Sequence, residues 1–523
     1  MVGERGPIAG ALVRIQATSI AATTVSGGRF ALSVQGMGRD SADLTAWAPG
    51  YYCGGPVRAK TGQNYIRIRL RAHFRKDNPD YRWLSANSSV KTAEGQGCAA
   101  CHSRADTPGL PRLPVEEWRL DAHSRSAVNP IFLSMYQGTD VDGNRSPPTR
   151  WARDRDYGAF PLLPDPTRPY FGPGYKLDFP NSDGNCACCH APLAAAAGDP
   201  YGVDPVRLAG TALEGVTCDF CHKIWAVRLD PRTGLPFENM PGVLSFELRR
   251  PPQGHQYFAG PFDDVATGED TYSPLMTRSE ICAPCHFGIF WGTLIYNSFG
   301  EWLASPYSDP RFAGAKSCQD CHMPRGRADH FALPEKGGRR RDPATVATHL
   351  MPGISDEEFM RNAASLAVSA IKMGRELVVE VRVTNDRTGH HLPTDSPMRQ
   401  VFIAVEAREA GGRSLELLDG TTLPDWAGDL KGLPGRAYAK ILEDLWTESS
   451  PTANYWNPTR VLSDTRLAAF STDVSRYSFR TAGSGAVTVE ARLIYRRAFQ
   501  ELARQKSWKL TDLEMARAQV ALD

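Results

Sequence analysis

Near the start of the chain, apolar and polar positions alternate with the period of a β-strand over residues 13–17. A glycine turn at 26–28 leads to a second apolar run at 30–34, and this arrangement is typical of a β-hairpin. Two more strands are predicted, at 44–48 and 65–70. We therefore predict a small β-sandwich-like domain over residues 1–75.

The same alternation returns near residue 364 and continues towards the C-terminus. A hairpin is predicted from 366–371 and 377–383, joined by the turn Lys372-Met373-Gly374. Ser355 to Glu358 reads as a capping box that opens a short helix. Further strands are predicted at 401–407 and 487–495, and a helix at 499–507. We predict a β-sandwich-like, β-rich domain over 364–523.

The segment between these two regions keeps neither the strand period nor the helix period for long, and it is rich in proline and glycine. It contains one short pattern five times, Cys-x-x-Cys-His, which uses ten of the chain's 12 cysteines. The five copies are Cys98, Cys101 and His102; Cys186, Cys189 and His190; Cys218, Cys221 and His222; Cys282, Cys285 and His286; and Cys318, Cys321 and His322. This pattern is the attachment signature of c-type haem.

The spacing has a chemical reason. Two thiols three positions apart can form thioethers with the two vinyl groups of one porphyrin, and the histidine that follows is placed to ligate the iron. Structural zinc also uses Cys-x-x-Cys, but its pairs come in twos and need no histidine directly after the second cysteine. A disulfide framework explains neither the spacing nor the histidines. We predict five covalently attached c haems.

Seven of the 12 histidines lie outside the motifs, and five haems need five distal ligands if every iron is six-coordinate. The candidates are His123, His255, His349, His390, His391, His73 and His330, of which His73 and His330 are the weakest. One of the adjacent pair His390 and His391 is expected to ligate. Bis-histidine ligation predicts low-spin haems of low potential. Met323 is read as haem-edge packing.

The motifs define a pentahaem core over residues 76–363, predicted to be loop-rich and mainly α with little regular structure. Motifs two and three lie 32 residues apart and motifs four and five 36 apart, which favours close packing of those haems. Cys53 and Cys188 are left over, either as buried thiols or as a disulfide. Arg339-Arg340-Arg341 is read as a solvated loop, with contact to haem propionates or an acidic partner as the alternative.

Composition narrows the class further. The chain has 523 residues, a formal net charge of +2 and 23% charged residues, so nucleic acid is not an expected partner. No apolar run is long enough to span a membrane. No signal peptide is visible, yet c-type haem attachment takes place outside the cytoplasm. We expect an exported protein, periplasmic or extracellular, whose signal was removed before this numbering begins.

Two segments resemble known families. Residues 1–75 resemble the carboxypeptidase regulatory-like domain through Pro7 to Ala11, Gly28 to Phe30 and Ala48 to Tyr51. Residues 215–394 resemble multihaem cytochromes related to cytochrome c nitrite reductases and hydroxylamine oxidoreductases. The segments that carry this second resemblance are 215–224, 301–307, 318–324 and 388–394. The first resemblance implies a binding or spacer module, and the second implies stacked haems and electron relay.

The expected function is electron transfer, as a conduit to redox partner proteins or extracellular acceptors. Its special case is a filament of identical subunits, resembling the nanowires of metal-reducing bacteria. The alternative is a multihaem oxidoreductase acting on a small nitrogen or sulfur species at one five-coordinate haem. All five motifs end in histidine, whereas some enzyme relatives carry a Cys-x-x-Cys-Lys variant, and this difference favours the carrier. A structural or adhesion role is the third hypothesis.

Overall fold

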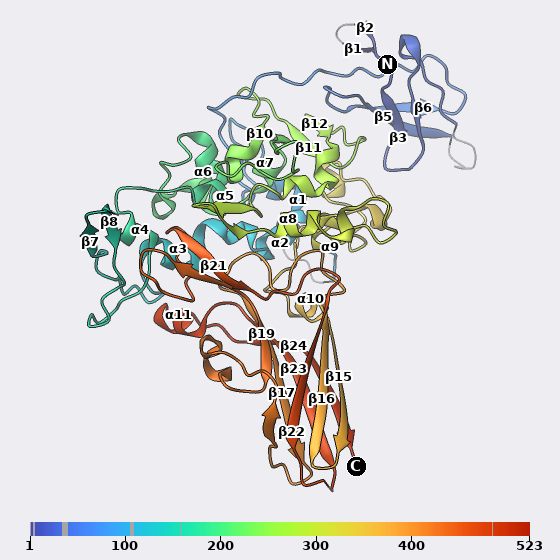
Figure 1. Cartoon of the computed structure of the whole chain (residues 1–523). Coiled ribbons are helices and arrows are strands. Elements are labelled where there is room, and N and C mark those ends of the chain that lie inside the picture. The colour runs from blue at the N-terminus through green and yellow to red at the C-terminus, as the bar shows by residue number, and fades with distance from the viewer. Residues whose placement is uncertain (1, 4–5, 34–39, 105–108, 157, 484) are drawn as a thin grey trace. The chain divides into compact units, whose positions relative to one another are not determined.

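The computed structural model describes residues 2–3, 6–33, 40–104, 109–156, 158–483 and 485–523 (Figure 1). The chain forms two compact units, each assembled from separate stretches of sequence. Unit 1 comprises Met1–Val128, Gly184–Pro284 and Ser317–Met351. Unit 2 comprises Asn129–Asp183, Cys285–Lys316 and Pro352–Asp523. Within the described residues, none of the helices has the length and apolar character needed to cross a membrane.

Unit 1 begins with one antiparallel sheet of order β4-β3-β5-β6. Its inward residues include Val13, Ile15 and Leu44, all nearly inaccessible to solvent. The strands predicted at 13–17 and 44–48 overlap β3 and β5, whereas two others are wrong, because residues 30–33 and 65–68 form no strand and pack on the sheet as loops. Residue 34 lies outside the described residues. The strands are β1 Val2–Gly3, β2 Gly6–Pro7, β3 Leu12–Ile15, β4 Ala21–Thr23, β5 Ser41–Trp47 and β6 Gly54–Lys60.

The prediction of a mainly α haem core is also wrong. The chain is 20% helix and 28% strand, and the helices within 76–363 are only four to eight residues long. They are α1 Ala99–His102, α2 Pro114–Leu120, α3 Pro130–Gln137, α4 Tyr175–Asp178, α5 Ala187–His190, α6 Pro192–Ala197, α7 Cys218–Cys221, α8 Ser298–Leu303, α9 Cys318–His322 and α10 Glu357–Arg361. A motif of five residues needs one helical turn only, and proline or glycine follows within three residues of the ends of α3, α4, α5, α6, α8 and α9.

The same segment contains small two-stranded sheets instead of long helices. They are β7 Trp151–Asp154 with β8 Gly158–Pro161, β9 Ile224–Val227 with β10 Phe246–Leu248, β11 Phe258–Gly260 with β12 Asp270–Tyr272, and β13 Gly288–Phe290 with β14 Thr293–Tyr296. Only β11 and β12 pair in parallel among these four described pairs. Such short pairs hold loops in register and leave most of the segment irregular.

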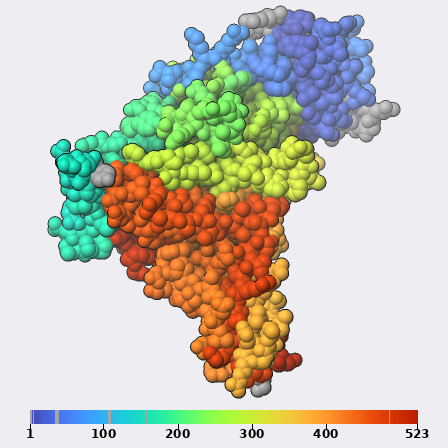
Figure 2. Space-filling view, in the orientation of Figure 1, coloured from blue at the N-terminus to red at the C-terminus, as the bar shows by residue number. Residues whose placement is uncertain are grey.

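The C-terminal part of unit 2 contains two antiparallel four-stranded sheets, of order β15-β16-β22-β18 and β19-β17-β23-β24. Side chains of both sheets form one core, to which β16 contributes Leu377, Val379, Val381 and Val383 at alternate positions. The strands are β15 Ser365–Met373, β16 Glu376–Thr384, β17 Gln400–Glu409, β18 Glu416–Asp419, β19 Gly435–Tyr438, β22 Thr472–Arg480, β23 Val487–Arg496 and β24 Leu513–Leu522. The surface of this part of the chain is coloured from light orange to red in the space-filling view (Figure 2).

Several predicted elements of this region are confirmed. The hairpin is β15 and β16, paired with Val368 opposite Val381, and the strands at 401–407 and 487–495 are parts of β17 and β23. The helix predicted at 499–507 is α11 Gln500–Gln505. The capping box is wrong by one residue, because Asp356 and not Ser355 accepts the amide N–H of Phe359. The strands β20 Lys440–Asp444 and β21 Thr459–Asp464 form a separate pair.

Candidate haem-binding sites

Four of the five Cys-x-x-Cys-His motifs coincide with a single helical turn, on α1, α5, α7 and α9. The fourth motif forms consecutive turns after a short 3-10 helix, Ser279–Ile281. One helical turn places residues three apart on the same face, as two thioethers to one porphyrin require. Thr217 and Ser317 cap two of these helices, because their hydroxyls accept the amide N–H of Phe220 and Asp320.

The first and third motifs meet in unit 1. The Cys98 thiol lies beside the Cys218 thiol, and this proximity, together with burial, raises the pKa of Cys98. This contact comes in addition to the close packing of motifs two and three that their spacing along the chain predicts. The structure therefore brings together two attachment points that are 120 residues apart in the sequence.

Three of the motif histidines direct Nδ1 at a backbone carbonyl. The acceptors are Phe331 O for His102 at 2.6 Å, Ala259 O for His222 at 2.5 Å and Ser126 O for His190 at 3.2 Å. A neutral imidazole that donates through Nδ1 carries its lone pair on Nε2, which is the atom that ligates haem iron in this orientation. The residues present therefore fit c haem, and His102, His190 and His222 would be proximal ligands. The fifth motif's histidine, His322, ends α9.

The fourth motif differs in the group that faces Nδ1. His286 Nδ1 lies 3.5 Å from Oδ2 of Asp395, and the Ser298 hydroxyl donates to the same carboxylate at 2.7 Å. Burial alone would raise the pKa of Asp395, but His286, Arg399 and Ser298 together hold that pKa well below its usual range. The carboxylate is therefore charged, and His286 would be a more basic iron ligand than a histidine bonded to a carbonyl.

Two of the candidate distal histidines are paired with carboxylates through Nδ1. Asp121 accepts from His123 Nδ1 at 2.7 Å, and Glu269 accepts from His255 Nδ1 at 2.9 Å. His123 does not lie on α2 with Glu117, because α2 ends at Leu120 and a 3-10 helix, His123–Val128, follows. A carboxylate–histidine pair is the common second contact of a metal-bound imidazole.

His349 lies close to the first and third motifs. Burial, together with the nearby His222 and His102, lowers the pKa of His349 to about 3, so the ring is neutral. Its Nδ1 is buried and has no hydrogen-bond partner among the described residues. Its backbone N–H donates to Oε2 of the buried Glu117 at 2.7 Å. A neutral, buried imidazole is the form that ligates iron.

The adjacent histidines of unit 2 stand beside the buried Glu301. The His391 amide donates to Oε2 of Glu301 at 3.0 Å, and His391 Nδ1 lies 3.5 Å from Oε1. Arg466 donates to the same carboxylate at 2.7 Å. His390 Nδ1 contacts the carbonyl of His391 at 3.1 Å. The two rings are thus held by different groups.

The remaining two candidates have Nε2 engaged by a side chain. Thr271 Oγ1 lies 3.0 Å from His73 Nε2, and Arg104 contacts His330 Nε2 while Asp329 contacts its Nδ1. The ring of His73 packs on Tyr52, Tyr257 and Trp225. These contacts favour a packing role over iron ligation for both histidines.

His73 gives a pH-dependent prediction. Burial lowers its pKa to about 4, so between pH 6.5 and 4 the unfolded chain binds a proton that the folded chain does not. Stability should therefore fall as pH falls through this window, by about 2–3 kcal/mol from this residue. Guanidinium unfolding of wild type and His73→Phe at a series of pH values should show a shallower decline in the variant. Equal slopes would mean that His73 does not titrate in this way.

Two other sequence predictions have outcomes here. Cys53 and Cys188 are buried free thiols, and the disulfide alternative is wrong. The solvated reading of the arginine run is wrong for Arg341, whose side chain is only 7% exposed, pairs with Asp264 at 2.7 Å and stacks on Phe262. Asp264 also accepts the Ala17 amide N–H at 2.6 Å, which ties the N-terminal sheet to the haem segment within unit 1.

Sequence reasoning missed the carboxylates that hold these histidines, Glu117, Asp121, Glu301 and Asp395. Asp121 lies two residues from its histidine, and a local Asp-x-His pattern could have shown it. Glu117 and Asp395 contact residues 232 and 109 positions away. No local pattern identifies partners at such distances.

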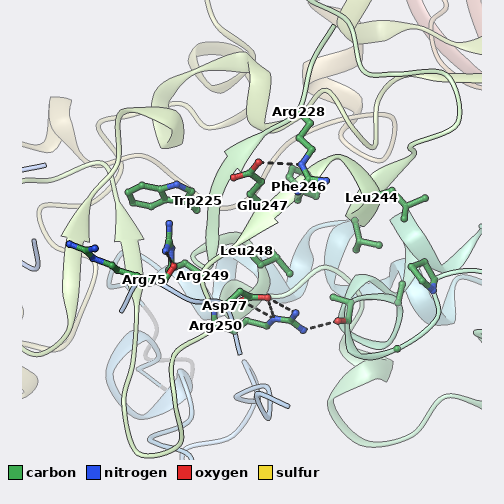
Figure 3. A pocket seen from close by; sticks show the side chains of 15 residues that line it. Arg75, Asp77, Trp225, Arg228, Leu244, Phe246, Glu247, Leu248, Arg249 and Arg250 are labelled. Carbon is green, nitrogen blue, oxygen red and sulfur yellow. Dashed lines mark hydrogen bonds and ion pairs between the residues drawn. The ribbon is translucent and has the colours of Figure 1, made fainter. Parts of the chain in front are cut away.

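A pocket of about 460 Å³ in unit 1 carries excess positive charge (Figure 3). Arg250 pairs with Asp77 and Arg228 with Glu247, as the dashed lines show. Arg249 stacks on the ring of Trp225 at 4.5 Å, and Arg75 also lines the pocket. Four arginines and two carboxylates leave a surplus that suits an anionic group.

The motifs and the oriented rings fit covalently attached c haem, and the fold is similar to that of a solved multihaem cytochrome. The penta-haem cytochrome c552 from Thermochromatium tepidum has a similar structure, with a TM-score of 0.53 and 18% identity over 78% of this chain and 96% of that chain. The PapD-like domain 7 of human CEP192 has a TM-score of only 0.13 at 6% identity, over 30% of this chain and 82% of that chain, and carries no argument. No family model and no curated protein matches the sequence.

Proposed function

We propose that the chain transfers electrons through five covalently attached c haems, as a periplasmic or extracellular conduit. The observation that carries the proposal is the orientation of His102, His190 and His222, whose Nδ1 atoms face backbone carbonyls and leave Nε2 available to ligate iron. Haem supplies the one-electron redox chemistry when bound. The protein's own residues attach it, select the ligand tautomer and set the local charge.

The ligand supply is tighter than the sequence count suggested. His73 and His330 have Nε2 engaged, which leaves His123, His255, His349 and the pair His390 and His391. Five saturated haems therefore require both members of the adjacent pair, or release of His73 or His330 from its contact. If only one member of the pair ligates, four histidines serve five irons.

This shortage supports a second candidate function, an oxidoreductase acting on a small nitrogen or sulfur species at one five-coordinate haem. A cavity of about 1080 Å³ lies beside the first motif, lined by Ala99 and Ser103 together with Arg104, Arg327 and His330. Arginine and histidine suit a small anion. Catalysis at this haem would need an open coordination position facing that cavity.

The two candidates differ in iron spin state. The pyridine haemochrome assay should return five haems per chain for both. In low-temperature electron paramagnetic resonance, the conduit predicts low-spin ferric signals only. A high-spin ferric signal that responds to nitrite or cyanide would contradict the pure conduit and support the enzyme. Fewer than five haems would contradict both proposals.

The proposed partners are redox proteins or extracellular acceptors, and the electropositive pocket around Arg249 suits an acidic partner. A filament of identical subunits is the special case of the conduit. Negative-stain microscopy of the purified protein separates these arrangements. Discrete particles at every concentration would contradict the filament.

A further inference from the structure

Two segments of the chain share one spacing. In each, a Cys-x-x-Cys-His motif is followed by fourteen residues and then by Glu-Trp: Cys98 to Trp118 in the first, and Cys282 to Trp302 in the second. Each matched residue of the first segment lies 184 positions before its counterpart in the second. Glu117 and Trp118 lie on α2, and Glu301 and Trp302 lie on α8. A spacing shared by a motif and a following dipeptide suggests an internal repeat.

The two tryptophans make the same contact. Trp118 Nε1 donates to the carbonyl of Val216, and Trp302 Nε1 donates to the carbonyl of Lys316, both at 2.8 Å. Val216 and Lys316 each stand two residues before the first cysteine of a further motif. In both copies the indole therefore fixes the chain that leads into the next haem-binding helix.

The two glutamates also make the same contact. Glu117 Oε2 accepts the amide N–H of His349 at 2.7 Å, and Glu301 Oε2 accepts that of His391 at 3.0 Å. Both glutamates are only 5% exposed. If one of these hydrogen bonds is lost, water cannot readily take the place of the missing partner, so the loss costs free energy. Both histidines precede leucine, with proline one or two residues further on. Each carboxylate therefore anchors a His-Leu loop that contains a candidate distal ligand.

A third contact matches, and the copies then diverge. In the first copy, Asp121 lies four residues after the glutamate and accepts the amide N–H of His123 at 3.1 Å. In the second copy, Ser305 lies four residues after the glutamate and accepts the amide N–H of Tyr307 at 3.3 Å. The backbone turn is shared, whereas only the first copy presents an imidazole at this position.

We propose that the chain contains two copies of one haem-binding module, and that Glu117 and Glu301 are the positioning residues for its distal-ligand loops. The inference rests on the proposed haem-binding function and deepens it. A buried carboxylate that accepts a loop amide fixes the backbone from which the histidine ring reaches iron. The leucine variant removes this acceptor, whereas glutamine retains an acceptor oxygen of the same reach.

The test compares Glu117→Leu and Glu301→Leu with Glu117→Gln and Glu301→Gln in the full haem-loaded chain. Each leucine variant should convert one haem in five from low to high spin, read by electron paramagnetic resonance and by the visible spectrum. The glutamine variants should keep the wild-type spin states. Glu238→Leu, at an exposed position, is the matched control and should change nothing.

Each outcome has a distinct meaning. Five haems and unchanged spin states in both folded leucine variants would overturn the module, whereas fewer than five haems in wild type would contradict the proposed function itself. Loss of the same haem signal in both variants would also overturn the inference, because two copies must affect two haems. If a leucine variant does not fold, aspartate at the same position keeps the charge but withdraws the acceptor. A partial high-spin signal is then expected, and its absence overturns the proposal.

Discussion

Replacing Lys223 by methionine is expected to lower the free energy of unfolding by about 3–5 kcal/mol, the usual cost of leaving a buried charge without its partner. Lys223 directly follows His222, and its ammonium lies 2.5 Å from Oδ1 of Asp219, inside the third motif. Neither side chain is exposed to solvent. The variant would leave the Asp219 carboxylate buried with its cation removed.

The surroundings of this pair explain why no other group replaces the lysine. The ammonium lies 4.1 Å from the ring centre of Phe258 and 5.1 Å from that of Tyr81. Asp219 Oδ2 accepts from the Leu84 amide at 2.8 Å and from the Tyr81 hydroxyl at 3.1 Å. These neutral donors reach only Oδ2, so without Lys223 they would neither replace its contact with Oδ1 nor balance the charge of the carboxylate.

The measurement is guanidinium unfolding followed by far-ultraviolet circular dichroism, at fixed pH and salt. Asp219→Asn combined with Lys223→Met should recover much of the loss, because the uncompensated charge is gone. Arg232→Met is the matched control: its ion pair with Asp230 is exposed on the arginine side, so a change within about 0.5 kcal/mol is expected. A Lys223→Met variant as stable as this control would show that the buried pair contributes nothing.

Local signals in the sequence sufficed for the parts of the structure that are local. The hairpin of β15 and β16 follows from strict alternation on both sides of Lys372-Met373-Gly374. The haem motifs follow from covalent chemistry at fixed spacing. In both cases the determining residues lie within about twenty positions of one another, so their pattern needs no knowledge of the fold.

The features that the sequence did not predict depend on contacts between residues far apart in the chain. The acceptor for His102 Nδ1 is the carbonyl of Phe331, 229 residues away, and Cys98 meets Cys218 although nearer motifs were available. The mainly α expectation failed because a haem motif needs only one helical turn, while the loops between motifs are held by carboxylates and short strand pairs. Arg341 shows the same limit, since a basic run reads as solvated until Asp264 and Phe262 are known to face it.

The haem of the fourth motif is expected to have its midpoint potential raised by about 60 mV when Asp395 is replaced by asparagine. A charged carboxylate beside Nδ1 makes His286 more basic and favours ferric iron, whereas the three rings bonded to carbonyls lack this charge. A tenfold change in the preference for ferric over ferrous iron corresponds to about 59 mV for one electron. The potential is expected to rise because the substitution removes a negative charge beside the histidine that ligates the iron.

Asparagine is the informative substitution because it keeps the backbone and the size of the side chain. Asp395 has a φ of 61°, a left-handed conformation that asparagine also adopts readily. Its amide oxygen can still accept from the Ser298 hydroxyl, which donates to Asp395 at 2.7 Å. The variant therefore changes the charge facing His286 and leaves the turn in place.

The measurement is a spectroelectrochemical titration of the haem-loaded chain, fitted as five one-electron steps. One step should shift upward in Asp395→Asn, with haem content and spin states unchanged. Asp425→Asn, at an exposed position in unit 2, should leave all five steps in place. An unchanged titration in Asp395→Asn would mean that the carboxylate does not tune this haem, and a downward shift would reverse the proposed sign. Because only His286 among the motif histidines with a described Nδ1 contact faces a carboxylate, the shift also assigns one potential to the fourth motif.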